Sequence, residues 1–431
     1  MALCVLATSI TGVFSVAGAV VDQHLDSLSR SHQFIITGGQ KLSHEDIDSL
    51  TKTIYGFYYS QFRHSQDPEA PYFMFISKEA NVMMGIGGVV RMRGWYDWGG
   101  AIPSNGFVPA LIPIPSDPAN SRKLGTTPAG TSLFFRLMGS SKVLGEYQLY
   151  IEANFNGYHS RDFELKKAYA QLRDFTIGYA PSTFSDPAAL PPTVDAQGPT
   201  NKISPTAVLV RWMPEFGRWS IALSLESPDG VISVDDKTTS KSGQWLPDGA
   251  LFLQYGWARG QHVRLSGIIR GLSYRDLVAQ RNRTIAEWGV QLSSVAHPWS
   301  PVTTYLSASY GRGYGSLCND LMAVTSDLVP DVEMPGTLYA PDGWGYCAGV
   351  QYNFTPELFC SAQFSQTHLL LRKADTKPDS YKYGWCASAN VFWNLTRRLQ
   401  IGAEIDIAKR QNESGEHRYA RRIGAMVQFS F

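Results

Sequence analysis

The sequence has no long hydrophobic run after its first two dozen residues, although 44% of its 431 residues are hydrophobic. A transmembrane helix needs about 20 consecutive apolar residues, so helical membrane spans are excluded for the rest of the chain. The net charge is only +1, which leaves no basic footprint for nucleic acid. The sequence also lacks Gly-x-Ser-x-Gly, Cys-x-x-Cys and His-Glu-x-x-His motifs. We therefore expect no metal and no cofactor, and an enzyme assembled from distant strands stays a minor alternative.

An alternation of apolar and polar residues is what the chain does have. From Ile423 to Phe431 every second residue is apolar, and the residues between them are mostly polar or small. This period of two is typical of a strand with one apolar face. The last strand of an outer-membrane β-barrel needs a lipid-facing row and an aromatic residue at the interface. The sequence thus predicts such a barrel, with Phe429 and Phe431 as its carboxyl-terminal assembly signal.

The same alternation recurs along residues 81–431. Near residue 90, Val90 and Met92 alternate with Arg91 and Arg93, which predicts an apolar outer face and a charged inner face. Short connections alternate with connections that are in most cases longer, as in bacterial barrels. The chain is therefore predicted to be all-β, an antiparallel transmembrane β-barrel of about 16 strands. The predicted strands are 83–98, 131–140, 144–156, 163–173, 175–180, 204–213, 219–226, 249–257, 262–272, 285–295, 302–312, 343–354, 357–368, 380–395, 399–409 and 417–431.

The first residues form an apolar run that closes on Ala17-Gly18-Ala19, a small-x-small cleavage pattern. We interpret residues 1–19 as a secretory signal peptide, with a buried amino-terminal helix as the alternative. The basic start of such a signal is missing, which leaves the true start codon open.

Residues 20–80 are predicted to be a periplasmic segment with a short helix at about 43–62. Ser43 and Asp46 form a start like a capping box, and apolar residues follow at helical spacing from Ile47 to Phe57. Two interpretations stay open, a short coiled coil that holds an oligomer together and an amphipathic helix packed against the barrel mouth.

The bore of the barrel requires a constriction. Sixteen strands leave an aqueous channel unless something fills it, and the segment before the first strand is too short for the plug of the 22-stranded transporters. The proline-rich stretch at about 181–203 is the candidate for an inward-folded loop, because prolines stiffen it; an ordinary external loop is the alternative. Its candidate constriction residues are Ser182, Thr183, Phe184, Asp186 and Asp195.

This region resembles the DcaP-like porins of Gram-negative outer membranes. The resemblance lies in Ala168-Tyr169-Ala170, Ile177-Gly178, the stretch from Ser182 to Pro191, and Gly198-Pro199. It implies a sixteen-stranded homotrimer in the bacterial outer membrane, narrowed by its third external loop and associated with uptake of small anions such as dicarboxylates. It further implies contact with outer-membrane lipids and, during biogenesis, with the barrel assembly machinery. The chain departs from the family at Pro181, where we expect Trp, and at Lys166-Lys167, which stand in place of a dense arginine pattern.

Strand parity predicts which charged residues line the pore. If the first six strands border the constriction, the first five of the basic residues below form a wall that faces Asp186 and Asp195, and the field across the pore favours small anions. The alternative is a structural charge network without solute preference. The predicted basic pore-lining residues are Arg91, Arg93, Arg136, Lys167, Arg211, Arg264, Arg270 and Arg422.

The predicted function is passive diffusion of small hydrophilic solutes with a preference for anions. The alternative is a non-conducting structural or adhesive barrel that acts through its long loops at 99–130 and 313–342. Cys318 and Cys347 bracket the second of these loops, and either a disulfide or two buried free thiols fits the sequence.

Overall fold

The computed structural model describes residues 34–37, 73–76, 82–141, 145–155, 162–258, 260–396 and 398–431. The predicted signal peptide at 1–19 and the predicted helix at 43–62 lie outside these residues. Within them, no helix is long and apolar enough to cross a membrane. Their helices are short 3-10 turns: η1 (Pro109–Leu111), η2 (Pro118–Asn120), η4 (Pro187–Ala189), η5 (Gly315–Leu317), η6 (Leu321–Ala323) and η7 (Lys373–Asp375).

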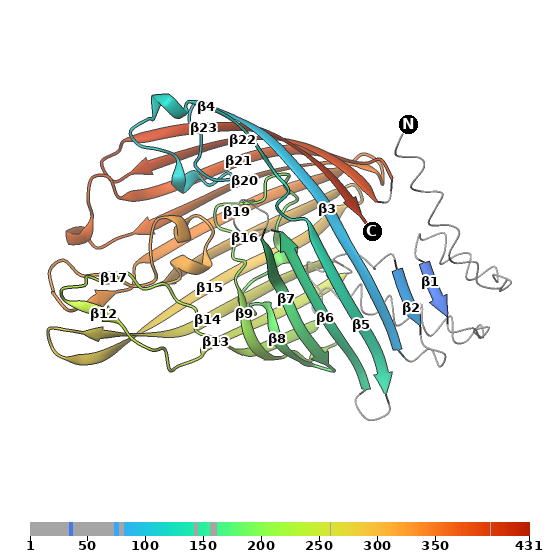
Figure 1. Cartoon of the computed structure of the whole chain (residues 1–431), viewed down its shortest axis with the longest axis horizontal. Helices are drawn as coiled ribbons and strands as arrows, with labels where there is room; N and C mark the ends of the chain where they lie inside the picture. Colours follow the sequence, from blue (N-terminus) through green and yellow to red (C-terminus); the bar gives the residue numbers. More distant parts are fainter. Residues whose placement is uncertain are drawn as a thin grey trace.

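Sixteen of the described strands pair antiparallel into a closed ring (Figure 1). This confirms the predicted all-β barrel and its strand number. The ring consists of β3 (Val82–Trp98), β5 (Ser132–Ser141), β6 (Gly145–Phe155), β7 (Phe163–Leu172), β8 (Phe175–Pro181), β9 (Thr206–Trp212), β11 (Trp219–Glu226), β13 (Asp248–Ala258), β14 (Gln261–Asp276), β15 (Arg281–Trp299), β16 (Val302–Arg312), β19 (Asp342–Asn353), β20 (Leu358–Leu370), β21 (Tyr381–Asn394), β22 (Leu399–Asn412) and β23 (His417–Ser430).

The ring closes between the first and the last of these strands. β23 pairs with β3 from Arg421 opposite Trp98 to Ser430 opposite Val89. One residue further on, the backbone of Phe431 both donates to and accepts from Gly88, at 2.9 and 2.8 Å. Because every ring strand has two neighbours, the barrel has no free edge among these strands.

The burial of side chains is the reverse of that in a soluble domain. Along β22, Ile405 faces outward and is 44% exposed, whereas the neighbouring Glu404 and Asp406 face inward and are 3% and 2% exposed. Other strands repeat this pattern, with apolar residues outside and polar or charged residues inside. This is the distribution that a lipid environment requires.

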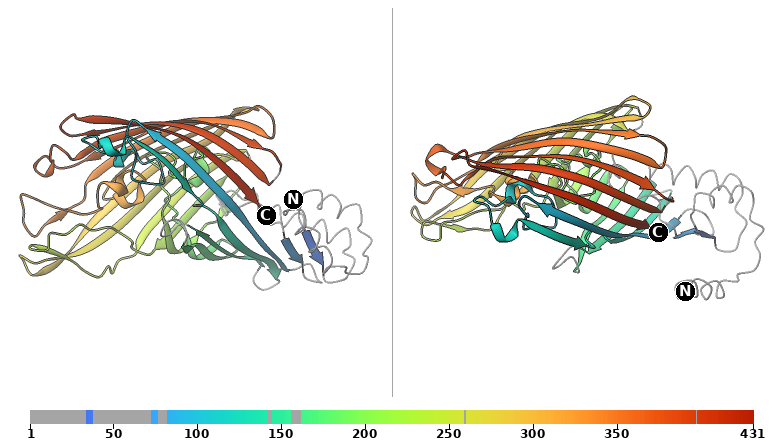
Figure 2. Two further views of the ribbon diagram at one scale, coloured as in Figure 1. Left: turned by 45° about the horizontal axis from the view of Figure 1, so that its top comes forward. Right: turned by 90° about the horizontal axis from the view of Figure 1, so that it is seen from above.

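The ends of the barrel differ in their connections. Short turns and the carboxyl terminus lie at one end, and the longest loops lie at the other (Figures 1 and 2). By the rule for bacterial barrels, the first end is periplasmic and the second is external. Two strands extend further than predicted at the external end, since β14 reaches Asp276 and β15 begins at Arg281.

Several short strands were not predicted. β4 (Arg122–Thr127) pairs with the external half of β3, and β2 (Phe73–Ile76) pairs with its periplasmic half. The polar composition of β4 and the brevity of the others hide them from a search for alternation. The remaining ones are β1 (Phe34–Thr37), which pairs with β2, β10 (Glu215–Phe216), β12 (Thr239–Lys241), β17 (Val329–Pro330) and β18 (Leu338–Tyr339).

Three long loops fold together inside the barrel. They follow β3, β8 and β16, and each contributes to one apolar cluster with the inner wall. Val108 comes from the first loop, Phe184 and Ile203 from the second, and Cys318 and Leu321 from the third, all of them buried. The three loops thus bury apolar side chains against one part of the inner wall.

Candidate pore constriction

The loop that follows β8 runs along the inner wall. At its neck, the backbone amide of Thr183 donates to Glu226 of β11 at 2.8 Å, and Ser182 donates its amide to the carbonyl of Pro205 at 3.0 Å. Phe184 is fully buried, and its carbonyl accepts from the hydroxyl of Ser266 on β14 at 2.9 Å. The neck of the loop therefore packs against β11 and β14.

Asp186 anchors the loop to the wall formed by β14 and β15. Its carboxylate contacts His262 at 2.8 Å and Ser293 at 2.6 Å, and Arg264 lies 3.6 Å away. Burial by itself raises the pKa of Asp186, but Arg264 and the bonds from His262 and Ser293 outweigh it and hold that pKa below its usual range. The carboxylate of Asp186 therefore contacts residues of β14 and β15, and none of these contacts is with the five basic residues that it was predicted to face.

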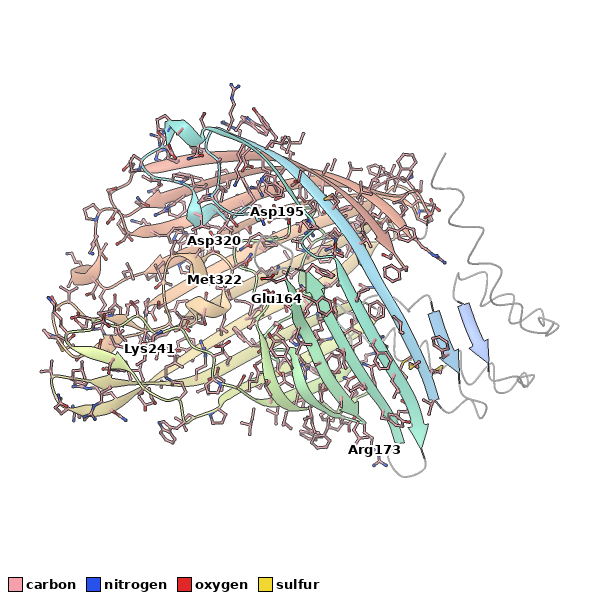
Figure 3. The ribbon with its side chains drawn as sticks, in the orientation of Figure 1. Glu164, Arg173, Asp195, Lys241, Asp320 and Met322 are labelled. Atoms are coloured by element: carbon pink, nitrogen blue, oxygen red, sulfur yellow. The ribbon has the colours of Figure 1, made fainter. Side chains whose placement is uncertain are left out.

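The middle of the loop is fastened to the last strands. The backbone amides of Val194 and Asp195 donate to the carboxylate of Glu404 on β22, at 2.8 and 2.7 Å. The carboxylate of Asp195 contacts Arg422 of β23 at 2.9 Å and accepts from the amide of Phe107 at 2.9 Å. Figure 3 shows Asp195 in the interior of the barrel. The wall carboxylate of Glu404 thus accepts hydrogen bonds from the loop backbone, and the loop carboxylate of Asp195 binds Arg422 on the wall. Both contacts hold the loop in place.

The returning half of the loop is clamped by the loop that follows β16. Asn319 donates its amide to the carbonyl of Lys202, and Asp320 donates its amide to Thr200, both at 3.0 Å. An isolated bridge joins Ile203 to Cys318. The position of the Lys202 backbone is therefore set by a second loop as well as by its own.

Arg91 and Arg93 lie on the inner face of β3, across from the loop. The guanidinium of Arg91 donates to Gln428 of β23 at 2.8 Å, and Arg93 donates to the carbonyl of Ala129 at 2.9 Å. Both side chains are half-buried. Arg93 is attracted by Asp195 and Glu404. The prediction that Asp195 faces these arginines stays a prediction, and the side-chain contact of its carboxylate is with Arg422.

A β-bulge brings a further lysine into the lumen. Glu152 of β6 is paired with Lys167 of β7, but the next pair is Ala153 with Leu165, so Lys166 is the extra residue. Its ammonium lies 2.8 Å from the Glu152 carboxylate, and Lys167 lies 3.8 Å from the same group. The Lys166 side chain is still 43% exposed. Strand parity alone assigned only Lys167 to the pore, because a bulge is not visible in the alternation.

Lys202 is a second basic residue that the sequence pattern did not assign to the pore. It projects from the loop, half-buried, and its ammonium donates to the carbonyl of Gln197 at 3.2 Å. Burial lowers the pKa of Lys202 and repulsion by Arg93 and Lys166 lowers it further, whereas Asp195 acts in the opposite direction. Lys202 therefore shares the electrostatic environment of the wall residues. Loop residues do not follow the alternation of a strand, so the sequence pattern gave no signal for Lys202.

The other predicted basic residues divide by role. Arg211 is half-buried on the inner face of β9, and the buried Arg136 stacks on the ring of Tyr150 at 4.8 Å. Arg264, Arg270 and Arg422 are buried in contacts that hold loops. Arg270 lies 3.0 Å from Asp248 and 3.2 Å from Asp327 of the loop after β16.

The four cysteines in the described part of the chain form no bridge. Cys318, Cys347, Cys360 and Cys386 are all free thiols, so Cys318 and Cys347 are not joined. Among the described residues, no group of His, Cys, Asp or Glu side chains could hold a metal ion.

Comparisons with known proteins bear on the fold. No protein-family model and no curated protein sequence matches this chain. The outer membrane channel DcaP of Acinetobacter baumannii superposes with a TM-score of 0.70 at 20% identity, over 82% of this chain and 98% of that one. The fold is that of a porin.

Two further porins share this architecture. The anion-selective porin from Comamonas acidovorans has a TM-score of 0.52 at 11% identity, over 81% of this chain and all of the other. OmpT of Vibrio cholerae in its trimer form has a TM-score of 0.50 at 9% identity, with the same coverage. The predicted resemblance to DcaP-like porins agrees with these structural similarities.

Proposed function

We propose that the chain is a porin of the bacterial outer membrane, a channel for passive diffusion of small hydrophilic solutes that prefers small anions such as dicarboxylates. The closed ring with an apolar outer face supports the membrane location. The width of a sixteen-stranded barrel supports conduction, since such barrels leave an aqueous channel.

One observation carries the proposed anion preference. Arg91, Arg93 and Lys166 of the wall retain solvent exposure, and Lys202 approaches them from the loop. The carboxylates of Asp186 and Asp195 are taken up by their own partners on the wall. A narrow passage lined by cations on both sides favours anions, because its field acts where the pore is narrowest.

The proposed assembly is a homotrimer in contact with outer-membrane lipids. OmpT is described in a trimer form, and the Comamonas porin is described as anion-selective. Both share the fold of this chain, which supports the same assembly and solute preference here. The inward packing of the loops after β3 and β16 supports conduction over the adhesive alternative, because it buries residues that an adhesive loop needs on its surface.

Planar-bilayer recordings of the purified, heat-modifiable protein test the proposal. We expect open channels in the nanosiemens range. In a tenfold potassium chloride gradient, the reversal potential should have the sign of the chloride equilibrium potential. A correctly folded barrel that conducts no ions would refute the channel. A channel with a potassium-side reversal potential would keep the porin and refute the anion preference.

A further inference from the structure

The outer face of the seam between the first and last strands carries only basic charge. On the described outward positions of β21, β22, β23, β3 and β4, the alternation leaves no Asp or Glu. Apart from Lys382 in the bulge of β21, which pairs with Glu413, it leaves three full charges, Lys409 on β22, Arg421 on β23 and Arg122 on β4. The lipid-facing side of this sector is therefore purely cationic.

These cations are neighbours at the external end of the barrel. Trp98 of β3 pairs with Arg421 on one side and with Arg122 on the other, so the three side chains form one row across adjacent strands. Strands are spaced about 4.8 Å apart, which separates the two arginine backbones by roughly 10 Å. Lys409 pairs with Tyr419, which is the neighbour of Arg421 on the outward face of β23. The charges thus lie within reach of one ligand.

Aromatic residues mark the depth of this patch. Tyr96 and Trp98 stack with ring centroids 6.4 Å apart, and Trp385 meets Tyr419 edge-on at 6.1 Å. Aromatic residues gather at the level where the hydrocarbon region of a membrane meets the polar headgroups. Below them the outward residues are apolar, beginning with Ile423. The cations therefore stand at headgroup level.

Two of the cations are held in place. The ammonium of Lys409 donates to the hydroxyl of Tyr383 at 2.9 Å and to Gln411 at 2.8 Å. The guanidinium of Arg421 lies over Gly99, where a Cβ atom would come within 3.2 Å of it. Gly99 also has a φ of +78°, so this close approach depends on glycine. At least two of the three cations are therefore held in defined positions.

Three other cations at the external end are paired with carboxylates. Arg312 binds Asp342 at 3.0 Å, Arg372 binds Asp331 at 2.6 Å and Lys382 binds Glu413 at 3.2 Å. Within the described part of the chain, no carboxylate forms an ion pair with Arg122, Lys409 or Arg421. The three seam cations thus differ from these three paired cations.

We propose that Arg122, Arg421 and Lys409 bind the phosphorylated headgroup of a lipid in the outer leaflet. The basic side chains contact its phosphates, and Ile407 and Ile423 pack against its acyl chains. This inference rests on the proposed location in the outer membrane, but it does not depend on conduction. The ligand is a lipid and not a free anion, because the charges lie directly above an apolar surface.

Native mass spectrometry of the full-length protein in detergent tests the proposal, with bisphosphorylated lipid A as the probe and phosphatidylcholine as the neutral reference. The variant Arg122→Gln, Arg421→Gln, Lys409→Gln should bind lipid A roughly 100-fold more weakly, since each basic residue at an anionic lipid surface contributes a factor of about five. The matched control, Arg312→Gln, Arg372→Gln, Lys382→Gln, removes the same residue types from paired positions and should bind as wild type does.

Three results would overturn the proposal. Equal lipid A binding by wild type and the seam variant would remove the site. Displacement of lipid A by inorganic phosphate would assign the patch to free anions. A seam variant that loses its oligomeric state, with unchanged lipid A bound per chain, would make the patch a contact between copies. The bilayer conductance of the seam variant is measured as well and should equal that of the wild type. This measurement distinguishes failure of the lipid site from failure of the channel.

Discussion

Arg422 binds two carboxylates, that of Asp97 on the first strand of the ring and that of Asp195 on the constriction loop. Its Nε and Nη2 atoms contact Asp97 of β3 at 2.7 and 3.0 Å, and its Nη1 atom contacts Asp195 of the constriction loop at 2.9 Å. Asp97 is the pairing partner of Arg422 across the seam. One guanidinium therefore joins barrel closure to the position of the constriction loop.

Replacement of Arg422 should affect stability and selectivity together. Arg422→Gln leaves Asp97 and Asp195 buried without their counter-charge, which costs about 3 to 5 kcal/mol for a buried pair. The released Asp195 also adds negative charge near Arg93, so the anion preference should fall. Arg312→Gln is the control, because its ion pair is exposed and contributes about 1 kcal/mol or less. Heat-modifiable gel migration and reversal potentials measure the two effects; equal unfolding temperatures for both variants would contradict this role.

The two arginines of β3 should control anion preference. The double variant Arg91→Gln, Arg93→Gln removes two positive charges from the inner wall and leaves the lipid face intact, so the barrel should fold. The reversal potential in a tenfold chloride gradient should move toward zero. The shift should shrink at high salt, because the Debye length drops from about 10 Å at 0.1 M to about 3 Å at 1 M. An unchanged reversal potential would place the narrow point elsewhere.

Lys202 should contribute to the same selectivity from the constriction loop. Lys202→Gln removes a cation that interacts with Arg93 and Lys166, so anion preference should fall while the barrel stays folded. Lys241→Gln is the matched control, because Lys241 lies at the external end, far from Asp195 in the interior (Figure 3). Selectivity equally altered in both variants would mean that total charge, and not the constriction, sets it.

Asp320 should make the packing of the loops pH-dependent. Burial raises the pKa of Asp320 to about 7, while Tyr381 and Arg410 act against this shift. Because the folded pKa lies above the ordinary value of 3.8, the folded protein binds more protons than the unfolded chain between these two values. Stability should therefore fall as pH rises from about 4 to about 7 and change no further through this group.

The variant Asp320→Asn isolates this effect. Asn keeps an acceptor for the hydroxyl of Tyr381, which lies 3.2 Å from the carboxylate, and removes the titration. The fall in unfolding temperature between pH 5 and pH 8 should shrink in the variant relative to wild type. The same pH dependence in both proteins would assign it to other carboxylates.

Deletion of Phe431 should impair assembly. Its backbone extends the seam by two hydrogen bonds to Gly88, and Phe429 faces the lipid at 43% exposure. The control is deletion of Ser414 in the turn between β22 and β23, which is exposed. Levels of folded protein in outer-membrane fractions should fall for the first deletion and stay near wild type for the second. Equal levels of folded protein for the two deletions would show that Phe431 is not part of the assembly signal.

The sequence by itself determined the barrel and the facing of its strand residues. A strand has a period of two, so the alternation around Arg91, Arg93 and Arg422 is enough to place each side chain inside or outside. Tertiary structure alone decided which charges meet. Asp97 and Arg422 lie 325 positions apart in the chain, and only barrel closure brings them together. The loop has no period, so the contact of Asp186 with His262 and the approach of Lys202 to Arg93 follow from how three loops pack in the lumen. Lys166 belongs to the same class, because a single bulge turns it toward Glu152 against the alternation of its strand.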